Sequence, residues 1–237
     1  MVTKGKEIYR GKAKSLYYTD DPTVAIMEFH DDATAFNGLK KGSIQDKGHC
    51  NCQISAIFFE KLKERGIRNH FQGFVSEREM LVNCLKILPV EVIVRNIAAG
   101  SLCKRLGVEP GVVFEKPVLE LCLKSDELGD PFINDDHVLA LKLASAEQLS
   151  EMKEMTLKIN EILKEITSAA NLILVDFKLE FGVQDGILYL GDEISPDTCR
   201  FWDADTKKVL DKDRFRNDMG EVTDAYQEVL QRLRRLT

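Results

Sequence analysis

The stretch Val175-Asp176-Phe177-Lys178-Leu179-Glu180-Phe181 alternates strictly between apolar and charged residues. Because side chains alternate across a β-strand, the four apolar residues share one face and the three charged residues share the other. Residues two apart on a strand are separated by about 7 Å, so Lys178 lies in a row between two carboxylates. The pattern predicts a half-buried strand, and a solvated polar face is the simplest interpretation of these seven residues alone.

The residues that follow this strand predict a hairpin. Val183-Gln184-Asp185-Gly186-Ile187 fits a type I turn that ends in glycine and closes a three-residue loop with a G1 bulge. In that register, Asp192 of the returning strand lies opposite Lys178 and diagonal to Glu180. A two-residue turn at Asp185-Gly186 would instead place Asp192 on the apolar face beside Leu179. Burying an unpaired carboxylate there is costly, so we expect the bulge.

With the bulge, Glu180 and Asp192 converge on one face, and a lysine lies between them. Mg²⁺ in proteins is usually held by one or two carboxylates together with substrate phosphates. The hairpin therefore predicts a magnesium site that a phosphorylated ligand completes.

The rest of the chain predicts an α+β fold with a β-rich lobe over residues 1–86 and an α/β lobe over residues 87–237. Apolar patterns predict strands at 7–10, 15–18, 24–29, 79–85 and 90–94, with Pro89 between the last two. Helical spacing predicts helices over 48–65 and 101–106. A capping box at Ser145 and Gln148 opens a long helix, and a C-terminal helix starts near Asp213. Clefts between lobes favour ligand binding.

Composition excludes several classes of protein. The 237 residues are 44% hydrophobic and carry a net charge of −6, which argues against disorder and against a nucleic-acid partner. No apolar run approaches the roughly 20 residues of a membrane helix, and the N-terminus has no signal-peptide core, so we expect a cytoplasmic protein without a membrane partner. The six cysteines lack zinc-site spacing and are expected to be reduced.

Two further segments have residues suited to binding phosphate. Gly11-Lys12-Ala13-Lys14 between two strands can supply backbone N–H groups and positive charge to a triphosphate, although a plain basic hairpin explains it as well. In Val94–Leu102, small residues and a glycine precede Ser101, which is suited to cap a short helix. Arg95 lies nearby, and together these groups can hold a phosphate; a capped helix with a surface arginine is the alternative.

Several loops carry charged residues that are unremarkable alone. Lys124 and Asp130 lie on one loop, and Arg200 follows a polar turn that begins at Glu193. The small-residue stretch 31–37 is expected to be a loop that acts as a flap. No histidine has ligand spacing, and no serine or cysteine motif indicates a covalent nucleophile.

Taken together, these segments resemble the SAICAR synthetase family of purine biosynthesis along nearly the whole chain. The resemblance is carried by five motifs: residues 9–14, 31–38, 90–101, 175–182 and 191–197. It implies a two-lobed fold whose N-terminal lobe is similar to those of protein kinases and ATP-grasp enzymes. One departure is Cys50-Asn51-Cys52, where an asparagine pair is frequent in the family.

The resemblance implies an ATP-dependent carbon–nitrogen ligase. Such an enzyme joins L-aspartate to the carboxylate of CAIR (carboxyaminoimidazole ribonucleotide) through an acyl phosphate, and it releases SAICAR, ADP and phosphate. A small-molecule kinase and a non-catalytic nucleotide-binding module are the alternatives. The family is commonly a homodimer or a larger homo-oligomer.

The resemblance also implies roles for particular residues. Gly11, Lys12, Ala13, Lys14 and Lys124 match the ATP-binding positions, and Glu180 and Asp192 match the Mg²⁺ ligands. Arg95, Ser101 and Arg200 match the positions that hold the phosphate of CAIR. Lys178, Asp176 and, less closely, Asp130 match catalytic positions on the substrate side.

Overall fold

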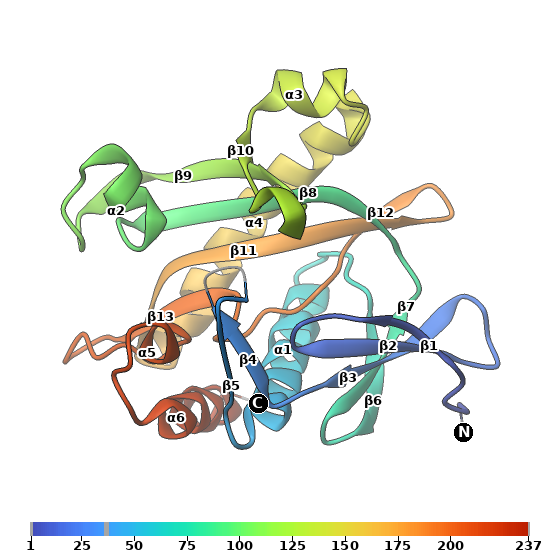
Figure 1. Ribbon diagram of the computed structural model, residues 1–237, viewed down its shortest axis with the longest axis horizontal. Coiled ribbons are helices and arrows are strands. Elements are labelled where there is room, and N and C mark those ends of the chain that lie inside the picture. The colour runs from blue at the N-terminus through green and yellow to red at the C-terminus, as the bar shows by residue number, and fades with distance from the viewer. Residues whose placement is uncertain (1, 36–37, 237) are drawn as a thin grey trace.

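The computed structural model describes residues 2–35 and 38–236. It contains a five-stranded antiparallel sheet from the first part of the chain, in the lower half of Figure 1. Its strand order is β1 (Glu7–Arg10), β2 (Lys14–Tyr18), β3 (Val24–Phe29), β7 (Glu79–Asn83) and β6 (Phe71–Ser76). A separate two-stranded sheet joins β4 (Asp32–Ala35) to β5 (Lys40–Ser43).

A second antiparallel sheet is formed by later residues and lies in the upper half of Figure 1. Its order is β10 (Phe132–Ile133), β9 (Val113–Leu123), β8 (Lys86–Ile97), β11 (Leu172–Gln184) and β12 (Ile187–Leu190), and β13 (Cys199–Asp203) pairs with the first half of β11. The strand β11 contains the alternating stretch 175–181. Its apolar side chains are buried, as the alternation predicted.

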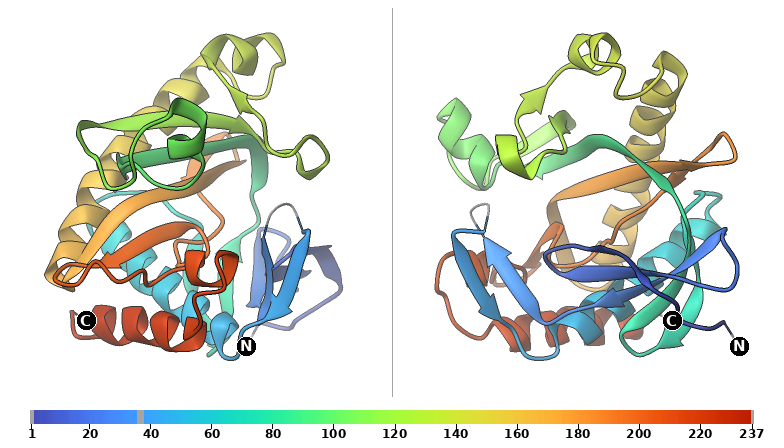
Figure 2. Two further views of the ribbon diagram at one scale, coloured as in Figure 1. Left: turned by 60° about the vertical axis from the view of Figure 1, so that its left-hand side comes forward. Right: turned by 45° about the vertical axis from the view of Figure 1, so that its right-hand side comes forward.

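One long helix packs on each sheet, and these two helices contact each other (Figure 2). The long α4 (Ala146–Ala169) packs on β8 and β11, and its capping box at Ser145 and Gln148 is formed as predicted. The helix α1 (Lys47–Glu64) packs on β3 and β6 and against the C-terminal α6 (Val222–Arg234). Short helices are α2 (Ser101–Leu106), η1 (Asp126–Leu128), α3 (Asp135–Ala140) and α5 (Asp213–Arg216). None of the helices in the described residues is long and apolar enough to cross a membrane.

One continuous hydrophobic core joins the two sheets. It includes Phe29 of β3, Phe58 of α1, Phe177 of β11 and Tyr226 of α6, all buried. Residues 1–86 thus share their core with the rest of the chain, and the expected division at residue 86 stays a prediction about domains.

The backbone also links the sheets directly. Leu190, the last residue of β12, donates its N–H to the carbonyl of Arg68 at 3.0 Å and accepts the N–H of His70 at 2.9 Å. This link lies two residues before Asp192, at the edge of the space between the sheets.

The predicted bulge in the β11–β12 hairpin is wrong. Gln184 pairs with Ile187, so the loop is the two-residue Asp185-Gly186 turn. Both residues have positive φ, 51° and 78°, which is the type I′ geometry that an Asp-Gly pair favours and that matches the twist of the strands.

Three other element predictions also need correction. Pro89 does not end a strand: it lies inside β8, where the pairing with β11 is irregular and a missing N–H is tolerated. The C-terminal helix is divided into α5 and α6, with Gly220 at φ 71° between them. Residues 32–35 of the expected loop form β4, and Phe36 and Asn37 lie outside the described residues.

Candidate active site

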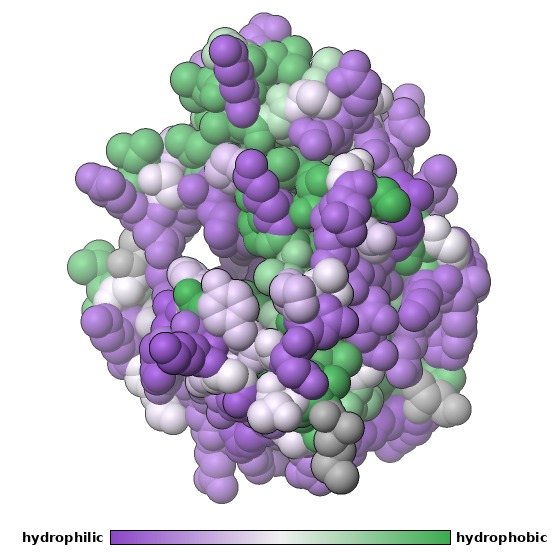
Figure 3. All heavy atoms as spheres, turned by 90° about the vertical axis from the view of Figure 1, so that its right-hand side faces the viewer, coloured by the Kyte–Doolittle hydropathy of each residue, from purple (hydrophilic) through white to green (hydrophobic). Residues whose placement is uncertain are grey.

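A cleft of about 750 Å³ lies between the two sheets. In the space-filling view, a hollow with a mainly hydrophilic rim opens between the upper and lower parts of the molecule (Figure 3). Every residue that the sequence singled out for binding or chemistry lines this cleft: Gly11, Lys12, Ala13, Lys14, Arg95, Ser101, Lys124, Asp130, Asp176, Lys178, Glu180, Asp192 and Arg200. The structure therefore brings together segments that are far apart in the chain.

Lys178 of β11 is the centre of a cluster of carboxylates. Its Nζ lies 2.5 Å from Glu180, 2.9 Å from Glu91 of β8 and 3.7 Å from Asp192. Burial would lower the pKa of Lys178, but the three carboxylates outweigh it and raise the pKa well above its usual value. The Lys178 side chain is therefore a fixed positive charge. Lys124 contacts Glu180 from the opposite loop at 2.7 Å.

Asp192 reaches this cluster by a route different from the predicted one. The strand β12 ends at Leu190, and Asp192 has a left-handed backbone, with φ 58°. Aspartate tolerates this conformation better than most residues. The turn directs its carboxylate to Lys14 and Lys178 rather than to the apolar face. Burial would raise the pKa of Asp192, but these two ammonium groups hold it below the usual value.

The glycine-lysine segment lies between β1 and β2 at the rim of the cleft. The N–H of Gly11 donates to the carbonyl of Lys14 at 2.8 Å, which closes the turn. Lys12 contacts Asp126 at 2.5 Å, and Lys14 contacts Glu193 at 2.9 Å as well as Asp192. Both predicted lysines thus point to carboxylates at the cleft.

Asp176 lies between two arginines because its strand β11 pairs with a strand on each side. Arg95 of β8 and Arg200 of β13 are its direct cross-strand partners, and their guanidinium groups contact its carboxylate at 3.0 and 2.7 Å. Arg95 also contacts Glu120 at 2.5 Å. Burial would lower the pKa of Arg200, but Asp176 and Asp213 outweigh it and raise the pKa.

Ser101 is not the helix cap that the sequence predicted. Gly100 caps α2 and Ser101 is its first residue, with an Oγ that accepts a hydrogen bond from Arg95 at 3.4 Å. Gly100 has φ 57°, and a Cβ there would lie 2.4 Å from Arg200 Nη2. The arginine takes the space that a side chain at position 100 would need, so only glycine fits there.

Asp130 also lines the cleft, although its own carboxylate has a local partner. Its Oδ1 accepts the N–H of Ser125 at 2.9 Å, and its backbone has φ 50°. This contact holds the loop that carries Lys124.

The carboxylates present fit a Mg²⁺ ion that a ligand completes. Glu180 and Asp192 both lie within reach of Lys178, and hard carboxylate oxygens are the donors that Mg²⁺ prefers. Within residues 2–35 and 38–236, no three His, Cys, Asp or Glu side chains are grouped as a ready-made metal site. Two carboxylates with space for phosphate oxygens are what such an ion needs.

Sequence reasoning missed several cleft residues: Glu91, Asp197, Thr198, Lys212 and Arg216. Glu91 has a signal, since it interrupts the apolar run of β8 two residues from Pro89. Burial raises its pKa despite the ammonium of Lys178. Lys212 and Arg216 lie in a charged stretch of ordinary appearance, and only the tertiary fold brings them to the cleft.

Comparison with solved structures gives the class of the protein. The crystal structure of phosphoribosylaminoimidazole-succinocarboxamide synthase from Ehrlichia chaffeensis matches with a TM-score of 0.95 and 43% identity, over 97% of this chain and 98% of that one. A SAICAR synthetase in complex with ADP matches with a TM-score of 0.93 and 49% identity, over 96% and 97%. The two-sheet fold with this cleft is thus that of a ligase of purine biosynthesis.

Sequence comparison gives the family. The SAICAR synthetase family profile matches residues 7–233. The phosphoribosylaminoimidazole-succinocarboxamide synthase of Caldanaerobacter subterraneus is 55% identical over 99% of this chain and 100% of its own length, and that of Hahella chejuensis is 52% identical over 98% of each. The chain belongs to the SAICAR synthetase family, and it joins aspartate to CAIR in purine biosynthesis. The resemblance to this family that the sequence predicted is confirmed. The two alternative functions, a small-molecule kinase and a non-catalytic nucleotide-binding module, are not supported.

Proposed function

We propose that ATP, Mg²⁺, CAIR and L-aspartate meet in the cleft between the two sheets. The observation that carries this proposal is the convergence of all the predicted site residues, from Gly11 to Arg200, on one cavity. Because those residues come from both sheets and several loops, local sequence bias does not explain their meeting.

ATP would lie under the glycine-lysine segment. Lys12, Lys14 and Lys124 each contact a carboxylate across the cleft, and triphosphate oxygens can take those positions. The apolar residues Leu16 and Met27 line the same cavity and suit a purine base. Glu180 and Asp192 would hold Mg²⁺, which when bound neutralises phosphate charge during transfer.

CAIR would place its phosphate at Arg95, Ser101 and Arg200. The two guanidinium groups are held side by side by Asp176, so they are preorganised for an anion before it arrives. Lys178 lies between this end of the cleft and the Glu180–Asp192 pair. With its phosphate at the two arginines, CAIR would point its carboxylate toward the triphosphate of ATP.

The reaction then has two steps. A carboxylate oxygen of CAIR attacks the γ-phosphorus of ATP, the bond to the bridging oxygen breaks, and ADP leaves. The neutral amine of aspartate attacks the acyl carbon, the bond between that carbon and the phosphate oxygen breaks, and the leaving phosphate takes up the proton that the amine loses as the amide forms. Phosphoryl transfer needs position and charge neutralisation more than a protein nucleophile. Lys178 and Asp176, on the substrate side of β11, would supply position and charge, and Asp130 would hold the Lys124 loop.

A coupled assay for ADP release tests the function. We expect ADP release to need CAIR, to reach its full rate only with aspartate, and to yield one free phosphate and one SAICAR for each ADP. A phosphorylated product that persists in place of free phosphate would indicate a kinase. ADP release that ignores both CAIR and aspartate would contradict the proposal.

The family resemblance also underlies our expectation of a cytoplasmic homodimer or larger homo-oligomer. Sedimentation equilibrium of the purified chain measures the state directly, and a monomer at all concentrations would contradict the expectation.

A further inference from the structure

Lys14 of β2 is held by two consecutive carboxylates from the opposite wall of the cleft. Its Nζ contacts Asp192 and lies 2.9 Å from Glu193 Oε1. Lys14 belongs to the five-stranded sheet, whereas the two carboxylates follow β12 of the second sheet. All three side chains are largely buried: Lys14 and Asp192 are each 16% exposed, and Glu193 is 4% exposed. This contact therefore joins the two walls of the cleft beside the proposed triphosphate site.

The two carboxylates differ in what else they contact. Asp192 faces the cleft, where Lys178 Nζ lies 3.7 Å from its Oδ2. In the proposed function Asp192 binds Mg²⁺, and a dication attracts a carboxylate more strongly than an ammonium does. Glu193 has both of its oxygens occupied within the protein, because Oε1 faces Lys14 and Oε2 accepts a hydrogen bond from Ser195 Oγ at 2.8 Å.

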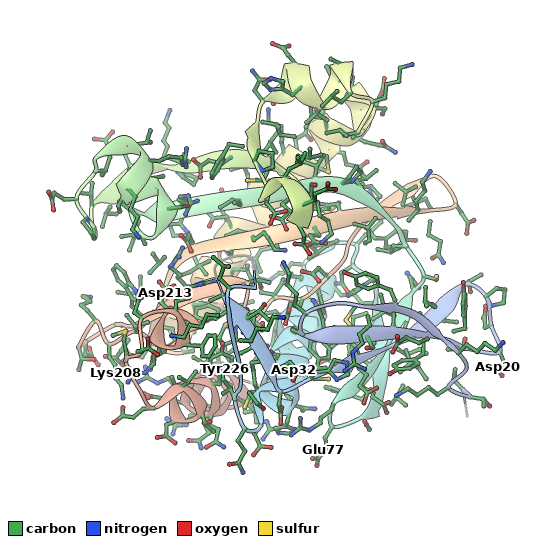
Figure 4. All side chains as sticks on the ribbon, viewed as in Figure 1. Asp20, Asp32, Glu77, Lys208, Asp213 and Tyr226 are labelled. Carbon is green, nitrogen blue, oxygen red and sulfur yellow. The ribbon has the colours of Figure 1, made fainter. Side chains whose placement is uncertain are left out.

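The polar turn that follows Glu193 anchors its carboxylate. Ser195 is fully buried, and its Oγ also accepts the N–H of Asp197 at 3.1 Å. Thr198 Oγ1 donates to the Glu193 carbonyl at 3.1 Å. Asp197 in turn accepts the hydroxyl of Tyr226 on α6 at 2.7 Å (Figure 4). Glu193 is therefore fixed relative to the core, and the Lys14 ammonium is fixed through it.

We propose that Glu193 is a positioning residue for Lys14, and that it keeps the Lys14 ammonium at the triphosphate when Asp192 binds Mg²⁺. This inference rests on the proposed function, which places ATP and Mg²⁺ beside these side chains. Among the described residues, the carboxylates that contact Lys14 are Asp192 and Glu193. With Asp192 bound to metal, Glu193 is left to hold the ammonium at the end of its flexible four-carbon stem.

The variant Glu193→Gln separates the effect of position from the effect of charge. A carboxylate beside a triphosphate repels it, so removal of the charge alone should tighten nucleotide binding. We expect the opposite. The Kd for a non-hydrolysable ATP analogue with Mg²⁺, measured by calorimetry, should rise about five- to tenfold, because a neutral hydrogen bond replaces a charge-assisted one. Without Mg²⁺ the Kd should stay within about twofold of wild type, because Asp192 then still holds Lys14.

Ser195→Ala tests the anchor without a change of charge. It releases one oxygen of Glu193, and we expect the Kd for the analogue with Mg²⁺ to rise about threefold, the effect of one lost hydrogen bond. In a Lys14→Met background, neither Glu193→Gln nor Ser195→Ala should weaken binding further, because both act through Lys14.

Glu79→Gln is the matched control. Glu79 also pairs with a lysine, Lys4 at 2.5 Å, but it is not among the described residues that line the cleft. This variant should bind the analogue as wild type does, with and without Mg²⁺.

The outcomes separate the inference from the proposed function. The inference is overturned if Glu193→Gln binds the analogue with Mg²⁺ as tightly as wild type or more tightly. It is also overturned if the loss is equal without Mg²⁺ or persists in the Lys14→Met background. If wild-type protein binds no nucleotide, or forms no aspartate-dependent amide product, the proposed function fails instead. If Glu193→Gln does not fold, Ser195→Ala alone and in the Lys14→Met background decides the question by the same criteria.

Discussion

Asp192 enters the cleft through its own backbone conformation. With an ordinary extended backbone, the two-residue turn would have placed its carboxylate on the apolar face of the hairpin, beside Leu179. The left-handed φ of 58° reverses that direction and brings the carboxylate to Lys14 and Lys178. Glu180 and Asp192 therefore converge on Lys178, as predicted. The cause is the backbone conformation of Asp192, not the alternation of side chains along the strand.

The carboxylates Glu180 and Asp192 should be essential for turnover. We expect Glu180→Gln and Asp192→Asn each to lower kcat by roughly two orders of magnitude or more, because each removes a carboxylate that would hold the Mg²⁺ that neutralises phosphate charge. Initial rates at saturating substrates measure the effect, and circular dichroism checks that the fold is intact. Glu64→Gln, an exposed change on α1, is the control. Normal ATP-dependent turnover in both variants would refute the metal assignment.

Arg95 should act on CAIR and not on ATP. We expect Arg95→Ala to raise the KM for CAIR roughly ten- to hundredfold, since it removes a charged donor at the proposed phosphate site, and to change the KM for ATP far less. Arg105→Ala is a matched control because Arg105 shares the Glu120 partner but does not line the cleft. Equal effects of Arg95→Ala on both substrates would place Arg95 outside that site.

At the scale of elements, the β11–β12 hairpin shows what a local pattern can and cannot predict. The alternation of β11 predicted correctly that its apolar residues are buried. The expected solvated polar face is wrong, because Asp176 and Glu180 are buried as well, covered by the ion pairs of the cleft. The register depended on the turn, and both turn types were compatible with Asp185-Gly186. The cost of burying Asp192 on the apolar face favoured the bulged turn, which is not the turn observed. The protein avoids that cost in another way, because the left-handed backbone of Asp192 turns its carboxylate toward the cleft.

The strand β9 was not predicted because it pairs with β8 across the α2 segment, so tertiary contacts determine it more than its own sequence does. The short β4 pairs with β5 in a local hairpin, but it has few of the β-branched and aromatic residues that favour strands. The phosphate-site residues were predictable because glycine, serine, lysine and arginine cluster there locally. Lys212 was not, because nothing near it in the sequence distinguishes it from other surface lysines.

The type I′ turn should contribute measurably to stability. Gly186 has φ 78°, and a Cβ there meets no other atom, so Gly186→Ala adds backbone strain without a clash. We expect the free energy of unfolding in urea to fall by about 1 kcal/mol with kcat unchanged. Asp185→Asn, which suits the same turn, should have no destabilising effect. A stable Gly186→Ala protein would argue against the turn.

On the scale of the whole molecule, a net charge of −6 coexists with a cleft rich in lysine and arginine. The excess of acidic residues counted against nucleic acid as a partner, but it gave no information on phosphorylated ligands. In the cleft, carboxylates such as Asp176 and Glu180 hold the cations in place, so acidic residues build the anion site rather than oppose it.

The stability of the molecule should depend on pH through Asp211. This side chain is fully buried and accepts the N–H groups of Phe201 and Asp213, at 2.9 and 2.8 Å. Burial and the nearby Asp213 raise its pKa to about 7, against about 3.9 in an unfolded chain. Between these values only the folded state binds the proton, so this contribution to stability is complete below pH 4 and is lost as pH rises to 7.

Asp211→Asn should remove that dependence. We expect the unfolding free energy of wild type to lose more between pH 5 and pH 8 than that of the variant, as urea titrations at the two pH values measure. The same loss in both proteins would show that Asp211 does not titrate in this range.

The backbone link between Leu190 and residues 68–70 has a mechanical consequence. It joins one sheet to the other two residues before Asp192, so the two walls of the cleft are fixed relative to each other at the point where this carboxylate enters the cleft.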